Sequence, residues 1–448
     1  MSMTHDESAS FFYLNDVSIW GHLFDAQAWP NANNHWLNTI LFQFSTRIFS
    51  IHDWSIRLPN VFSFLVYSYY FIKLLEKVNE AHLRFLGFTV ALLNPYLLDF
   101  FTVARGYGLG LAFSTAALYH VYNYIINRKN SDIARGSFAF SIASLSLFSY
   151  FSLYLAVIGT LLLFITTRAD FELKKEIKSI SVIIGIAIIT FLLIYTPLTA
   201  LSKNDEFKWG ASSLIQSFSS LFINMGYGKW YASNGDFITG FVASGFGLAI
   251  LKNKSEFSKL KLRTSSHLLF TYILIGLFLI GMITSRYLLD TYYPIDRKTI
   301  IYIPLFVLFF VFSLDQFFQN KWKQYLSYFL GLVLIIHVLF SFRISATREW
   351  WYDANTKDFV QKIVNHNNDK LINTIGCHWF FYHTINHYNK SKHNNFLKLH
   401  DYNKEIDTTQ IYDYFICFDS DLEKLEDFYD VFYRDISGRM ILKKKSTL

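Results

Sequence analysis

Two adjacent carboxylates, Asp6 and Glu7, lie near the start of the chain, within the run Thr4-His5-Asp6-Glu7-Ser8. Long apolar stretches begin only near residue 57, so this acidic pair precedes all of them. A carboxylate pair in such a place can cap a helix, bind a metal ion or accept a proton as a general base. Asp is a favoured cap and Glu favours the first turn, so one expectation is a helix over residues 8–20 that Asp6 caps.

The metal alternative would use imidazole and carboxylate groups of the same segment, namely His5, Asp6, Glu7, His22 and His35. These residues do not follow a fixed metal-ligand spacing, so a divalent ion is possible but no metal site is predicted. General-base chemistry needs only one carboxylate near an acceptor hydroxyl, which the sequence permits. The chain also has neither a P-loop nor a Gly-rich dinucleotide fingerprint, so we expect no nucleotide and no bound cofactor.

Other polar candidates for substrate binding lie close to the ends of apolar stretches: Asn34, His35, Arg57, Asp99, Arg105, Tyr107 and Arg297. Charges so near hydrocarbon are costly unless they are paired or face a cavity. The alternative is anchoring, since Arg and Lys side chains reach to the interface and Tyr is common there. We assign Lys298 to anchoring. For Arg105 and Arg297 both roles stay open, because a guanidinium is well suited to grip a phosphate.

The elements that must position these residues are membrane helices, because 52% of the 448 residues are hydrophobic and only 17% are charged. Ten apolar segments have roughly the length that crosses a bilayer: 57–76, 85–102, 107–126, 137–151, 153–167, 179–198, 236–251, 266–288, 298–316 and 325–343. Residues 36–50 repeat apolar side chains at helical spacing and predict an amphipathic helix along the membrane surface. The small residues from Gly106 to Gly110 favour close helix packing rather than phosphate binding. The fold class is thus mostly α, a polytopic bundle over 57–343.

Basic residues set the expected orientation. Lys and Arg follow the first, third, fifth, seventh and ninth segments, which assigns those loops to the cytoplasm. The net charge of +7 then reflects topology, and no nucleic-acid partner is expected. Both chain ends fall outside, together with segments 1–56, 199–235, 289–297 and 344–448. Because no signal sequence opens the chain, we expect one further span upstream of Met1.

The tail over 344–448 changes character, with fewer apolar runs and many Asn, Asp, Lys and His residues. Strands are predicted over 371–380, 396–400 and 412–418, and helices over 381–390 and 422–433. These elements indicate a small external α/β domain. Cys377 and Cys417 fall on predicted strands, so they are either two buried free thiols or, if the strands are neighbours, a disulfide.

These features together resemble the GT-C class of membrane glycosyltransferases, and specifically the bacterial branch related to protein O-mannosyltransferases and the lipid A aminoarabinose transferase. The likeness covers roughly the first 125 residues, and four motifs carry it in order: Asp6-Glu7; Asn33-Asn34-His35; Arg57-Leu58-Pro59-Asn60; and Asn94-Pro95 through Leu98-Asp99 to Ala104-Arg105-Gly106-Tyr107. Further along the chain, only the number and polarity of the spans and a Tyr-Pro…Arg loop at 292–297 agree.

The resemblance implies a mechanism as well as a fold. Asp6 would be the catalytic base, and Glu7 would orient it or the acceptor. The donor would be a sugar on a polyprenyl phosphate, so that no nucleotide site is needed, and the transfer would be inverting. Arg105 and Arg297 would stabilise the departing lipid phosphate. The acceptor would be a glycan, a lipid or a protein, and the site would face the exterior of a bacterial inner membrane.

Two readings from other classes stay open. A transporter or flippase for lipid-linked glycans predicts charged residues deep within spans and internal repeats, neither of which is clear here. The low numbers of Gly (20) and Pro (6) also weigh against sliding, broken helices. The third reading is a non-enzymatic assembly protein whose tail domain does the binding.

Overall fold

Most of the chain is helical in the computed structural model, which describes residues 1–28, 32–167, 173–229, 233–252, 267–315, 321–367, 374–393, 397–435 and 437–446. The residues group into two compact units. The sheet unit comprises Met1–Asp16, Gln43–Ile56 and Arg343–Leu448, and the membrane unit comprises Val17–Phe42 and Arg57–Phe342. The acidic pair therefore belongs to the same unit as the tail, although most of the chain separates them in sequence.

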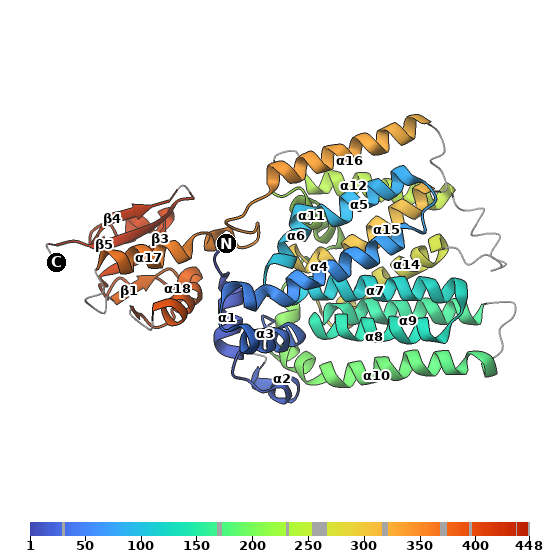
Figure 1. Cartoon of the computed structure of the whole chain (residues 1–448), viewed down its shortest axis with the longest axis horizontal. Coiled ribbons are helices and arrows are strands. Elements are labelled where there is room, and N and C mark those ends of the chain that lie inside the picture. Colours follow the sequence, from blue (N-terminus) through green and yellow to red (C-terminus); the bar gives the residue numbers. More distant parts are fainter. Residues whose placement is uncertain are drawn as a thin grey trace. The chain divides into compact units, whose positions relative to one another are not determined.

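The membrane unit is built from helices that run side by side (Figure 1). Two short helices and one amphipathic helix open it: α2 (Ile19–Phe24), η1 (Ala26–Ala28) and α3 (Trp36–Phe49), whose last residues enter the sheet unit. The long helices follow: α4 (Asp53–Leu75), α5 (Ala81–Leu92), α6 (Pro95–Thr102), α7 (Gly106–Asn127), α8 (Asn130–Ser146), α9 (Ser149–Thr166) and α10 (Leu173–Lys203). The rest are η2 (Glu206–Lys208), α11 (Leu214–Met225), α12 (Gly235–Lys252), α14 (His267–Leu288), η4 (Asp296–Ile301), α15 (Tyr302–Asp315) and α16 (Lys321–Ser341).

Each predicted apolar segment coincides with helix in the part of the chain that the structure describes. Six helices among these residues are long and apolar enough to cross a membrane on their own. A seventh candidate is the pair α5 and α6, which is bent by 49°. The segment predicted as one span over 85–102 is thus broken into two helices. Helix α6 begins at Pro95, and the Asn94 side chain caps it by accepting a hydrogen bond from the Leu97 N–H. The chain is a multi-pass membrane protein.

Small residues at the start of α7 allow close packing, as predicted. A side chain at Gly106 would meet the Ser146 carbonyl oxygen of α8 at 2.0 Å, and one at Gly110 would meet the Tyr150 ring at 2.4 Å. A side chain at Gly108 would come within 2.9 Å of the Asn60 amide oxygen on α4. These glycines therefore let three neighbouring helices approach the start of α7.

The sheet unit places helices beside a mixed sheet of strand order β2-β1-β3-β5-β4 (Figure 1). Its elements are α1 (His5–Leu14), η5 (Trp351–Asp353), α17 (Thr356–His366), β1 (Thr374–Cys377), α18 (Trp379–His393), β2 (Lys398–Leu399), β3 (Tyr414–Phe418), η6 (Asp419–Lys424), β4 (Tyr429–Arg434) and β5 (Arg439–Lys444). Strands β1, β2 and β3 are parallel, and β5 runs antiparallel to β3 and β4. Helix α1 packs on α18 within this unit.

The prediction of a helix over 422–433 is wrong. The 3-10 turn η6 ends at Lys424, and residues from Tyr429 form strand β4, which pairs with β5. The run Tyr429-Asp430-Val431-Phe432-Tyr433 is rich in aromatic and β-branched residues, which suit a strand. Residues 371–373 and Phe396 of the predicted strands lie outside the described residues.

The two cysteines are free, buried thiols. Strands β1 and β3 are neighbours, with Cys377 opposite Ile416. Because successive side chains of a strand point to opposite faces, Cys417 projects from the other face of the sheet and cannot meet Cys377. The disulfide alternative is therefore excluded by register.

Candidate functional site

The acidic pair lies in the first turn of α1, and Thr4 is the cap. The Thr4 hydroxyl accepts from the Glu7 N–H at 3.2 Å, and the Glu7 carboxylate accepts from the Thr4 N–H at 2.8 Å. This reciprocal pair is a capping box. The prediction that Asp6 caps the helix is thus wrong, and the helix expected over 8–20 divides into α1 and α2. Glu7 is engaged in the cap, whereas Asp6 is not part of it.

Asp6 is buried to 6% exposure and meets a side chain from far along the chain. The indole N–H of Trp350 donates to Asp6 Oδ2 at 3.2 Å. A hydrogen bond to a carboxylate oxygen favours the ionised form, which is the form that a general base must hold. Trp350 is itself 1% exposed, so this contact is shielded from solvent.

A third carboxyl group, Asp353, lies beside the pair and is not among the predicted site residues. Its Oδ2 accepts from the His5 N–H at 2.6 Å and its Oδ1 from the Thr384 hydroxyl at 2.9 Å. Burial raises the pKa of Asp353 well above its usual value; the charges of Asp6 and Glu7 add to the rise, and the two hydrogen bonds oppose it. The only local signal is the position of this acidic residue directly after the aromatic run Trp350-Trp351-Tyr352.

Imidazoles surround the same turn. His5 donates from Nδ1 to the Phe380 carbonyl at 2.9 Å, and its ring lies 4.7 Å from the ring of His383. Burial, with a further contribution from His5, lowers the pKa of His383 to about 4. This group is therefore neutral at physiological pH, so it adds no positive charge beside Asp6.

In the membrane unit, the residues predicted from Asn33 to His35 and from Arg105 to Tyr107 come together. Arg105, 1% exposed, donates from Nη1 to the Asn33 carbonyl and from Nη2 to its side-chain oxygen, both at 3.0 Å. The His35 ring lies 5.2 Å from the Tyr107 ring. Asn34 donates to the Ala28 carbonyl at 3.1 Å and contacts His22 Nδ1 at 3.3 Å.

Two asparagines that the prediction omitted tie this cluster to α4. Asn38 of α3 donates to the Ala104 carbonyl at 2.8 Å, and Asn60 of α4 donates to the Asn38 side-chain oxygen at 2.6 Å. Both asparagines are buried. Asn38 lies three residues after His35 and Asn60 stands in the Arg-Leu-Pro-Asn motif, so their spacing was the available signal.

The remaining predicted residues are more dispersed within the membrane unit. The Asp99 carboxylate on α6 accepts from the Tyr227 hydroxyl at 2.9 and 3.2 Å. Arg57 of α4 is 8% exposed. Arg297 is half-buried in η4, directly after Asp296, whose φ of 51° and bonds with Ser220 fix the turn.

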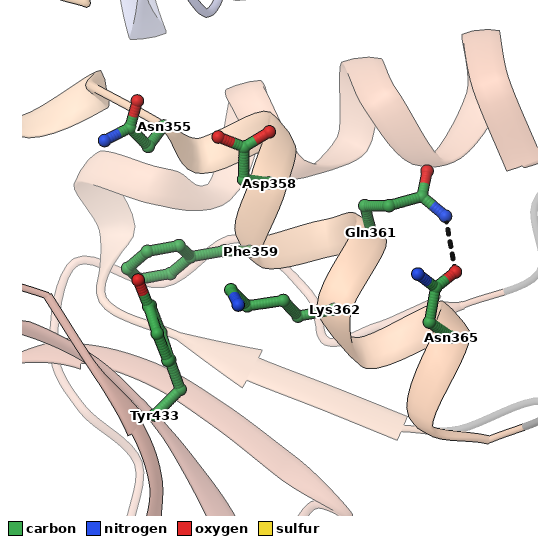
Figure 2. Close-up of a pocket in the computed structure, with 7 residues that line it drawn as sticks. All are labelled: Asn355, Asp358, Phe359, Gln361, Lys362, Asn365 and Tyr433. Atoms are coloured by element: carbon green, nitrogen blue, oxygen red, sulfur yellow. Dashed lines mark hydrogen bonds between the residues drawn. The ribbon is translucent and has the colours of Figure 1, made fainter.

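The described parts of the chain contain no metal-binding cluster but do contain a polar groove. No three His, Cys, Asp or Glu side chains there are arranged to hold a metal ion. One polar groove lies on α17 and β4 of the sheet unit, and none of the predicted site residues lines it (Figure 2). There Gln361 bonds Asn365 at 2.7 Å and the Lys362 ammonium lies 4.2 Å from the centre of the Tyr433 ring.

Comparison of the sequence with protein-family models gives no match, and comparison with curated proteins gives none either. Solved structures do match. The crystal structure of ArnT from Cupriavidus metallidurans in the apo state has 11% identity and a TM-score of 0.51, over 100% of this chain and 95% of that chain. The same protein bound to undecaprenyl phosphate has 12% identity and a TM-score of 0.39, with the same coverage. The apo structure shows the fold: this chain has the fold of ArnT.

Proposed function

We propose that the protein is a membrane glycosyltransferase that moves a sugar from a polyprenyl-phosphate-linked donor to an acceptor hydroxyl. The fold likeness to ArnT over the whole chain supports the enzyme class. The observation that carries the proposal is the placement of Asp6, a buried carboxylate on the first turn of α1 with a hydrogen bond from Trp350. The sequence motifs indicate the donor class.

In the proposed reaction, Asp6 accepts the proton of the acceptor hydroxyl as that oxygen attacks the anomeric carbon. The bond from the anomeric carbon to the phosphate oxygen breaks, so the configuration inverts and polyprenyl phosphate leaves. The Trp350 hydrogen bond favours the ionised base. Glu7 acts indirectly, because its carboxylate holds the first turn that carries Asp6.

The two candidate arginines take different parts in this proposal. Both Nη groups of Arg105 are directed at Asn33, so we assign Arg105 to holding the Asn33–His35 segment in place. Arg297 is the proposed ligand of the leaving phosphate, because it is half-buried and a guanidinium binds phosphate oxygens in pairs. Asn34, His35, Arg57, Asp99 and Tyr107 are proposed to shape the substrate site.

The basic loops support an orientation with α1 and the tail on the external face of the membrane, which we propose to be a bacterial inner membrane. The acceptor then reaches the enzyme from outside the cytoplasm. Lipid-linked sugars suit this side because they need no nucleotide in the external compartment.

The test compares Asp6→Asn with Asp16→Asn, the same substitution at an exposed aspartate of the same segment. Each full-length variant is placed in phospholipid liposomes with a panel of synthetic polyprenyl-phosphate hexoses and pentoses and an envelope extract as acceptor. Release of polyprenyl phosphate is measured. We expect Asp6→Asn to lose on the order of 100-fold or more in rate, and Asp16→Asn to match the parent. Full transfer by Asp6→Asn would refute the base assignment, and translocation with the donor left intact would indicate a flippase.

A further inference from the structure

The first turn of α1 is held by a short segment about 350 positions away in the sequence. Trp350 and Asp353 stand at the start and end of the turn that contains η5, and both side chains reach α1. Trp350 contacts the Asp6 carboxylate, and Asp353 contacts the His5 backbone N–H. All of these residues belong to the sheet unit.

This turn is itself rigidly supported. The Asp353 N–H donates to the Trp350 carbonyl at 3.1 Å, and the Thr356 hydroxyl donates to the Asp353 carbonyl at 3.1 Å. Arg439 of β5 is 1% exposed and donates from Nη1 to the Tyr352 carbonyl at 2.7 Å. The indole and the carboxyl group therefore approach α1 from a fixed backbone rather than from a loop that must first be ordered.

Asp353 and Trp350 have different effects on the first turn of α1. Asp353 accepts from the first helical N–H at 2.6 Å and from Thr384 of α18 at 2.9 Å, so it fixes where α1 begins relative to α18. Trp350 donates to one oxygen of Asp6 at 3.2 Å and so fixes the rotation of that carboxyl group. A base that must meet an acceptor proton gains rate from such orientation.

We propose that Trp350 is a positioning residue for the catalytic base: its indole N–H orients the Asp6 carboxylate and keeps it ionised. The inference rests on the proposed function, since it assigns Trp350 a role only through Asp6. The proposed role does not require Trp350 to contact the substrate, and its side chain is only 1% exposed.

The charged and titratable groups near Asp6 set the expected pH dependence. Among the described residues of the sheet unit they include Asp353 from the η5 turn, His383 from α18, and Glu7 and His5 from the helix of Asp6 itself. None of these changes when the indole N–H is removed. Because that N–H stabilises the ionised carboxylate, we expect its loss to move the acidic limb of the rate profile to higher pH.

The experiment replaces Trp350 in the full-length protein and follows polyprenyl phosphate release from the synthetic polyprenyl-phosphate sugars between pH 4 and 8. Trp350→Phe removes the N–H together with some volume, and 3-benzothienylalanine at position 350 replaces only the N–H by sulfur. The matched control is Trp351→Phe, because Trp351 is 46% exposed. If Trp350→Phe does not fold, the benzothienyl variant decides.

We expect the position 350 variants to lose about 10- to 100-fold in kcat with KM unchanged, and to shift the acidic limb upward by roughly one pH unit. Added to Asp6→Asn, Trp350→Phe should cost no further rate. An unmoved pH profile with lower thermal stability would show a purely structural role and overturn the inference. If Asp6→Asn is fully active, the proposed base is wrong; if Asp6→Asn is inactive while the benzothienyl variant is normal, only the role of Trp350 is wrong.

Discussion

Asp6 and Glu7 are neighbours in sequence, but the structure gives them different surroundings. Glu7 is 1% exposed and completes the capping box with Thr4, whereas Asp6 bonds the Trp350 indole. Gln can replace Glu in a capping box, because its side-chain oxygen also accepts from the cap N–H. Asn cannot replace Asp as a base, because an amide does not take up a proton near neutral pH.

The cap can be tested without touching the base. We expect Thr4→Ala to lower the free energy of unfolding by about 1 kcal/mol, because the Glu7 N–H loses its acceptor. Glu7→Gln, the matched variant on the other side of the box, should stay near the parent. Thermal unfolding of both proteins in detergent measures the difference, and a loss as large for Glu7→Gln would contradict this account.

Asp353 should make stability depend on pH. Its pKa in the folded protein lies above the ordinary value of 3.8, so the folded state holds the proton more tightly than the unfolded chain. The resulting stabilisation is complete below pH 4 and is lost as the pH rises toward the folded-state pKa. We therefore expect Asp353→Asn to be more destabilising at pH 4 than at pH 7. Unfolding temperatures across this range test it, and an equal cost at both pH values would contradict it.

At the scale of elements, the start of α7 is where several helices converge. Gly106 lies against the Ser146 carbonyl of α8, and Arg105 just before it holds Asn33. Asn38 and Asn60 connect the same region to α3 and α4. Buried amides in such a network need all of their partners, so the region tolerates little displacement.

Gly106→Ala should therefore be costly. The new methyl group would lie 2.0 Å from the backbone oxygen of Ser146, and backbone cannot move aside as a flexible side chain can. We expect a loss of about 1–3 kcal/mol in stability. Gly276→Ala on α14 is the matched control, because nothing lies within 4 Å of its added carbon. Unfolding midpoints of the two variants should differ clearly, and equal values would show that α7 and α8 can separate freely.

At the scale of the whole molecule, the ArnT-like fold extends over both the helical and the sheet-containing parts. The proposed orientation puts α1 and the tail outside and the loop after α4 in the cytoplasm. Both native cysteines are buried, so we expect them to react little with a maleimide that labels an introduced, exposed cysteine.

This orientation predicts a labelling pattern in intact spheroplasts. Asp430 of β4 and Glu76 after α4 are both exposed, and each can be replaced by Cys. We expect a membrane-impermeant maleimide to label Asp430→Cys directly and Glu76→Cys only after the membrane is permeabilised. The reverse order would invert the topology, and with it the compartment proposed for the acceptor.

Some features of the candidate site follow from local sequence patterns, and others do not. Thr4 and Glu7 have the three-residue spacing of a capping box, but Asp is also a favoured cap, so the sequence alone does not decide between Thr4 and Asp6. The aromatic residues of strand β4 fit both the helical and the strand periodicity over so short a run, which is why the helix prediction fails there. No sequence spacing links Asp353 to the acidic pair, because its partners His5 and Thr384 lie in distant segments.

The sequence by itself determined the membrane-helical class, the positions of the apolar helices and the four motifs, because hydropathy and spacing are local properties of the chain. Only the tertiary structure decided that the acidic pair shares a compact unit with the tail, and that Trp350 and Asp353 hold its first turn. It also decided that the two cysteines stand on opposite faces of the sheet. The physical reason is that burial, strand register and contacts between distant segments arise only when the chain folds and brings those segments together.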